Sequence, residues 1–169
     1  MSCKVLIVPE DPTYNGHILK PLIERILEHC GKPNAKVTVL SEPRLQGYNH
    51  AKEKLPEILD RYLHLDLILF LVDADGKDRT GEFTNLEKRS TKLLCAAAVQ
   101  EVEIWLLAGH ADKLAIQWQT IRQNISVKEQ IFAPFLAANG DPRRYGEGRD
   151  LLMKQALENT RASFSAAPN

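Results

Sequence analysis

The sequence has few of the features that mark a secreted, thiolate-metal or membrane protein. It contains only 3 cysteines in 169 residues, and they form neither a C-x-x-C pair nor a zinc motif. Few, unpaired thiols are typical of a reducing compartment, so we expect a cytoplasmic protein. No apolar run approaches the roughly 20 residues of a membrane span, and the run at residues 5–8 is too short for a signal peptide. We therefore expect no membrane association.

An excess of charge of one sign is also absent. The chain has 22 basic and 22 acidic residues, which gives a formal net charge of +0. This balance argues against a protein that coats nucleic acid, because such a protein would be basic. It leaves open an enzyme that contacts a few phosphates through a local patch. The length is sufficient for one domain with a proper hydrophobic core.

An unbroken apolar run at residues 67–72 predicts the central element of the fold, a strand at about residues 65–72. It has no polar alternation, which is typical of a strand buried on both faces of a sheet. Shorter apolar segments predict three further strands, and helical spacing of apolar residues predicts the helices between them. Because strands and helices alternate, we expect an α/β, three-layer fold with a mostly parallel central sheet of about four strands. The other strands are expected at residues 5–8, 36–40 and 93–99, and the first two helices at 17–31 and 49–63.

Later segments favour helices. We expect a single domain over residues 1–169, with a core at about 4–110 and a C-terminal helical extension at about 111–169. In the last helix, Leu151 and Leu152 are expected to face the core, and residues 121–139 give mixed signals that assign no element. The expected helices cover residues 83–92, a segment from about Glu101 to Gly109, 112–118 and 147–163.

Acidic residues follow three of the four expected strands. Glu10 follows the first, Asp73 and Asp75 follow the third, and Glu101 and Glu103 follow the fourth. In open α/β sheets ligands bind outside the carboxyl ends of the strands, which meet at one edge, so these acids are expected to converge. Carboxylates gathered there repel one another unless a cation neutralises them, and oxygen ligands suit Mg²⁺, with Mn²⁺ as an alternative.

The order of these motifs resembles the Toprim superfamily. The likeness is nearest to small stand-alone Toprim-like proteins related to the overcoming-lysogenization-defect nucleases. It implies a metal-dependent nuclease, or a nuclease component of a defence system, with Glu10 as general acid/base or ligand. It further implies that Asp73 and Asp75 hold Mg²⁺ and that Glu103, rather than Glu101, lies in or near the site. The segments that carry the likeness are residues 5–10, 69–75 and 103–108.

Polar and basic residues near these motifs are candidates for substrate contact. Asn15 stands where a loop enters the first helix, as an N-cap or a substrate-binding residue. Lys77 and Arg79 follow the Asp-x-Asp and could meet phosphates at the rim of the site. Two basic clusters extend this set: Lys88, Arg89 and Lys92 in the next segment, and Arg143, Arg144 and Arg149 beside Tyr145.

Two other functions fit parts of the pattern. The neutral charge is compatible with a non-catalytic Toprim-like binding or adaptor module with a protein partner or a second copy of the chain. The segment at residues 72–76 also resembles the nucleophile motif of haloacid-dehalogenase-type phosphatases, in which Asp73 would attack phosphorus and Asp75 would act as acid/base. The partners expected are therefore nucleic acid, another protein or a homo-oligomer.

Overall fold

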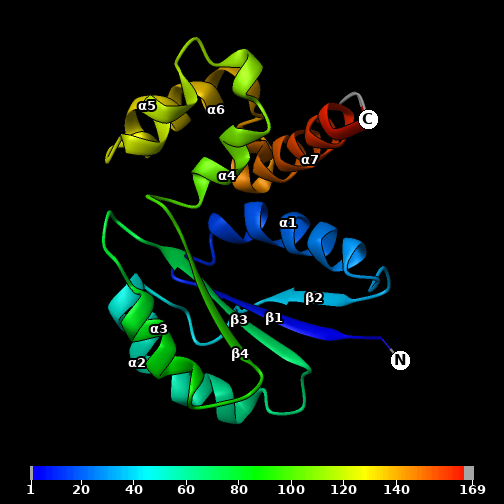
Figure 1. Ribbon diagram of the computed structural model, residues 1–169, viewed down its shortest axis with the longest axis vertical. Helices are drawn as coiled ribbons and strands as arrows, with labels where there is room; N and C mark the ends of the chain where they lie inside the picture. Colours follow the sequence, from blue (N-terminus) through cyan, green and yellow to red (C-terminus); the bar gives the residue numbers. More distant parts are fainter. Residues whose placement is uncertain (1, 166–169) are drawn as a thin grey trace.

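The computed structural model describes residues 2–165, with side chains described through Thr160. Four strands form one sheet in the order β2-β1-β3-β4, and every neighbouring pair is parallel. Helices cover both faces of the sheet (Figure 1). The expected three-layer α/β fold with a four-stranded parallel sheet is thus confirmed. The strands are β1 (Lys4–Pro9), β2 (Lys36–Val39), β3 (Leu67–Asp73) and β4 (Leu93–Ala98).

The central strand β3 contributes to two hydrophobic cores, which explains its unbroken apolar sequence. Ile68, Phe70 and Val72 belong to one core, whereas Leu69 and Leu71 belong to the other. Successive side chains of a strand point to opposite faces, so a strand with a core on each side needs an apolar residue at every position.

The helices divide between these two cores (Figure 1). Residues of α1, α4 and α7 pack into one core, and residues of α2 and α3 pack into the other. None of the described helices combines the length and apolar character that crossing a membrane requires. The bounds are α1 (Asn15–His29), α2 (Tyr48–Arg61), α3 (Thr80–Glu87), α4 (Glu103–Ala108) and α7 (Arg149–Ser165).

The part of the chain between α4 and α7 consists of short helical segments. The helix expected at residues 112–118 is wrong, because Leu114 and Gln117 have extended backbones. Leu114 and Trp118 still pack against the core, so their apolar spacing reflects burial of an extended connection. The segments are a 3-10 turn (Ala111–Lys113), α5 (Trp118–Gln123), a π-helical turn (Lys128–Phe132), α6 (Ala133–Asn139) and a 3-10 turn (Tyr145–Gly148).

Two further expectations are corrected by local contacts. Helix α3 starts at Thr80, where the Asp78 carboxylate accepts the Thr80 amide at 2.9 Å, and it ends at Glu87. Lys92 lies beyond it, and its ammonium donates to the carbonyls of Leu63 and Leu65, just before β3. Leu151 is 41% exposed, because the buried face of α7 runs through Leu152, Met153 and Ala156.

Two glycines give a matched test of how closely α4 and α7 pack. A Cβ on Gly109 would lie 2.3 Å from the Ala156 Cβ and 2.6 Å from its carbonyl oxygen, whereas a Cβ on Gly81 in α3 would meet nothing within 4 Å. Gly109→Ala is expected to lower the free energy of unfolding by about 1–3 kcal/mol through overpacking. Gly81→Ala is expected to leave it unchanged or raise it by up to about 1 kcal/mol. Urea denaturation of both variants measures the difference, and equal effects would contradict the packing described here.

Candidate functional site

The first two acids of the site are brought together by the pairing of β1 with β3. Pro9, the last residue of β1, pairs with Leu71; Glu10 follows it, and Asp73 ends β3. Because the strands are parallel neighbours, both side chains emerge at the same edge of the sheet. The two carboxyl groups lie within hydrogen-bonding range of each other. Asp73 is only 5% exposed, and Glu10 is partly buried.

Burial decides the protonation of this pair. Burial, the charge of Asp73, a hydrogen bond to Asp73 and the charge of Asp75 together raise the pKa of Glu10 to about 8. Burial also raises the pKa of Asp73, against the hydrogen bonds from Glu10 and the Val102 amide, which lower it. Two carboxyl groups in contact cannot both ionise at low cost. Without a cation the pair therefore keeps a proton, held mainly by Glu10, at neutral pH.

The start of α4 adds two more carboxyl groups beside Asp73. The Val102 amide donates to Asp73 Oδ1 at 2.7 Å, which ties the chain just before α4 to the end of β3. Glu103 is 0% exposed, and neither of its carboxylate oxygens has a hydrogen-bond partner among the described residues. Burial and the charges of Glu103 and Asp73 raise the pKa of Glu101 to about 7, against Lys128, which lowers it. Glu101 precedes α4, and its carboxyl group is close enough to Glu103 and Asp73 for their charges to act on it.

Lys128 places a positive charge in this acidic cluster. Its ammonium lies 3.5 Å from Glu103 Oε1, an ion pair without hydrogen-bond geometry. Burial lowers its pKa, but Glu103, Glu101 and Asp73 outweigh this and raise it. Lys128 opens the π-helical turn (Lys128–Phe132), a rare geometry that is frequent at functional sites. No local motif marks it in the sequence, and only the fold brings it to the acids.

The loop after β3 is organised by Arg79. Its Nε donates to the Asp73 carbonyl at 3.1 Å, and its Nη2 lies 3.4 Å from Asp75 Oδ2. Its guanidinium carbon lies 3.6 Å from the centre of the Tyr48 ring, and the Tyr48 hydroxyl donates to Glu82. Asp75 has a positive φ of 51° and an exposed side chain. Its charge still raises the pKa of Glu10.

The remaining candidates differ in position. Asn15 is not the N-cap of α1, because Tyr14 occupies that position without a side-chain cap. Asn15 is the first helical residue, 1% exposed, and its Oδ1 has no partner in the described part of the chain. Lys77 is exposed in the loop after Asp75. Lys92 lies at the opposite edge of the sheet, since it follows α3 and precedes β4, and the rim position expected for it is wrong.

The fold and site define an α/β protein with a buried carboxyl cluster at the carboxyl edge of a parallel sheet. Within residues 2–165, no three His, Cys, Asp or Glu side chains stand arranged as a ready metal site. No protein-family model, curated protein or solved structure matches this chain. What the site does therefore has to be argued from its own geometry.

The shared proton predicts how stability depends on pH. Above the ordinary pKa of 4.5 the unfolded chain ionises Glu10, whereas the folded protein keeps the proton up to about pH 8. The folded state binds more protons in this window, so the free energy of unfolding falls as the pH rises through it. Glu10→Gln is expected to remove part of this fall, and to stabilise the metal-free protein more at about pH 8 than at about pH 5.

Urea denaturation in a chelator at both pH values measures this effect. Glu24→Gln, on an exposed position of α1, is the matched control and should change stability equally at both. If Glu10→Gln also shifts stability equally at the two pH values, Glu10 does not hold a proton in the folded protein.

Proposed function

We propose that this protein is a Mg²⁺-dependent, phosphodiester-processing enzyme of Toprim type: a cytoplasmic nuclease, or a nuclease component of a defence system. The observation that carries the proposal is the parallel pairing of β1 with β3, which brings Glu10 and the buried Asp73 out at the same end of the sheet. Burying several carboxyl groups together is costly. A site that pays this cost at the ligand-binding edge of an α/β sheet is a candidate for function.

The donors of the cluster fit a hard divalent cation. They are carboxylate oxygens, which suit Mg²⁺ or Mn²⁺. Glu10 Oε2 and both oxygens of Glu103 have no hydrogen-bond partner among the described residues, so they keep lone pairs for a ligand. In the proposal Asp73, Asp75 and Glu103 hold the metal. Because the cation competes with the proton of the Glu10–Asp73 pair, its binding is expected to strengthen as the pH rises.

The chain's own residues then have distinct tasks. Glu10, with its raised pKa, accepts or donates a proton near neutral pH. Lys128 supplies positive charge beside the acids, where negative charge builds up on a phosphoryl group. Arg79 holds the loop that carries Asp75. A bound Mg²⁺ would activate water and neutralise charge on the phosphate. Lys77 and Asn15 remain proposed contacts to substrate.

Cleavage assays with isosteric variants test the proposal. Wild-type protein is expected to cleave DNA or RNA with Mg²⁺ or Mn²⁺. Asp73→Asn keeps an oxygen for the Val102 amide but removes the charge, and Glu10→Gln removes the proton-transfer group. Each is expected to lower the rate by about 100-fold or more. Gel electrophoresis of labelled single- and double-stranded substrates measures the rates.

The matched control is Asp60→Asn, at an exposed position of α2, which should cleave like the wild type. Circular dichroism of each variant confirms folding. Wild-type and Asp73→Asn protein with equal cleavage rates would exclude the proposed centre.

A second candidate is a non-catalytic Toprim-like module that binds another protein or a second copy of itself. It is favoured by the lack of a ready three-ligand group within residues 2–165. In that case the Glu10–Asp73 pair has no catalytic role, and a shared proton rather than a metal ion neutralises it. Calorimetry with Mn²⁺ separates the two functions, since heat of binding that disappears in Asp73→Asn supports the enzyme. The phosphatase alternative is less favoured, because Asp73 Oδ1 already accepts the Val102 amide.

A further inference from the structure

A cavity at the carboxyl end of β2 lies beside the acidic cluster. It has a volume of about 550 Å³ and is lined by the last residues of β2 and the segment that follows it (38–41), the loop after β1 and the N-terminal part of α1. In the sheet, β2 neighbours β1 on the side away from β3. The cavity therefore lies at the same edge as Glu10 and Asp73. The ends of β2 and β3 are about 10 Å apart, twice the spacing of neighbouring strands.

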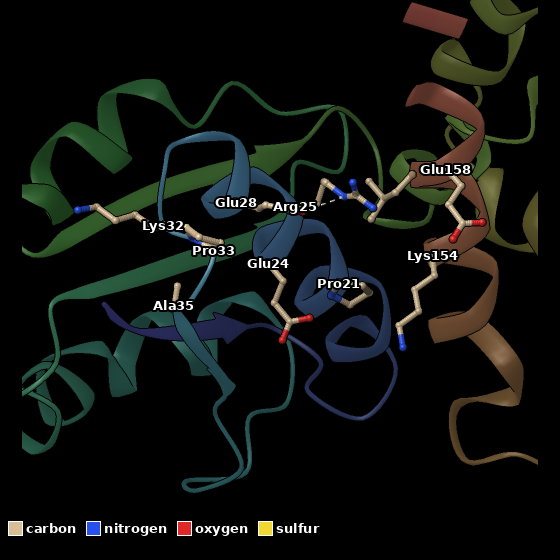
Figure 2. A pocket seen from close by; sticks show the side chains of 10 residues that line it. Pro21, Glu24, Arg25, Glu28, Lys32, Pro33, Ala35, Lys154 and Glu158 are labelled. Atoms are coloured by element: carbon tan, nitrogen blue, oxygen red, sulfur yellow. Dashed lines mark ion pairs between the residues drawn. The ribbon is translucent and has the colours of Figure 1, made fainter. Parts of the chain in front are cut away.

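The charged side chains that line this cavity are all basic. Its lining includes Lys20, Arg44 and His17, together with hydroxyl groups, and none of its described lining residues is acidic. This is unusual in a chain with as many acids as bases. A cavity between α1 and α7 gives the contrast, because Glu24, Glu28 and Glu158 balance its three basic residues (Figure 2). There Arg25 already pairs with Glu28 at 3.7 Å, as the dashed line shows.

An aromatic ring stands at the rim of the cationic cavity. Tyr145 lines the cavity and is 80% exposed. Its ring meets His17 edge to face, with the ring centres 5.1 Å apart. Glycine at position 146 permits this close approach, since a Cβ there would lie 2.5 Å from the His17 ring. Arg149 holds the turn by donating to the Gly146 carbonyl at 3.1 Å. The ring is thus exposed but fixed in position.

We propose that this cavity, with Lys20, Arg44 and Tyr145, binds single-stranded nucleic acid next to the acidic cluster. Lys20 and Arg44 contact backbone phosphates, and an unstacked base lies on the Tyr145 ring. Cationic grooves with exposed aromatic rings bind single strands, because every base offers a face for stacking. A duplex keeps its bases stacked on one another and so gains less from Tyr145. This inference builds on the proposed nuclease function and names its substrate class.

Binding without metal tests the inference separately from catalysis. Fluorescence anisotropy in a chelator is measured with labelled oligo-dT, oligo-U and a hairpin duplex of equal length. The wild type is expected to bind the single strands at least about tenfold more tightly than the duplex. Lys20→Glu with Arg44→Glu is expected to weaken single-strand binding at least about tenfold and to reduce the slope of log affinity against log salt by about 1.4. Tyr145→Ala should weaken binding without changing that slope.

The control variant carries Arg25→Glu with Lys32→Glu, the same change of charge in the balanced cavity of Figure 2. It should bind oligo-dT like the wild type. An equal loss in the control, equal binding of duplex and single strand, or no effect of Tyr145→Ala would overturn the inference. Cleavage is then measured with Mn²⁺. If the protein binds single strands but does not cleave them, the proposed nuclease function is wrong and the binding site stands. If cleavage is unaffected by Lys20→Glu with Arg44→Glu, the proposed binding site is wrong and the nuclease function stands.

Discussion

The structure of the site depends on one constraint: two carboxyl groups, the partly buried Glu10 and the buried Asp73, leave neighbouring strands at the same end of the sheet. Strand pairing imposes this, because the register of β1 on β3 brings both chain exits to the same point. Two buried carboxylates in contact would repel strongly. The site must therefore hold a proton or bind a cation. Groups from the surrounding elements affect which of the two is favoured.

The neighbouring elements compensate the buried charge from different directions. The amide of Val102 donates to Asp73 from the start of α4, and Lys128 approaches Glu103 from the π-helical turn. Arg79 donates to the Asp73 carbonyl and forms an ion pair with Asp75. Since one lysine stands among Glu101, Glu103 and Asp73, the cluster keeps an excess of acid. A divalent cation is one way to balance these carboxyl groups, and protons held by Glu10 and Glu101 are another.

The sequence predicts the sheet because burial on both faces leaves a local signature. The apolar run at residues 67–72 is typical of a strand covered on both faces, and acids placed after parallel strands are expected to meet at one end of the sheet. Lys128 could not be found this way, since it comes from a region without regular periodicity and reaches the site through tertiary packing. The same holds for the stacking of Arg79 on Tyr48, which joins residues far apart in the sequence.

Net charge conceals how the charges of this protein are arranged. The chain is formally neutral, yet acids gather at the exits of β1, β3 and β4, and bases line the cavity at the exit of β2. A phosphodiester chain needs both surroundings: cations along its backbone, and oxygen ligands for a metal at the scissile phosphate. Acids alone would repel it, and bases alone would bind it without chemistry. In the proposed function, the two surroundings on either side of β1 would hold a nucleic-acid strand at one end of the sheet and present a phosphate to the carboxyl cluster.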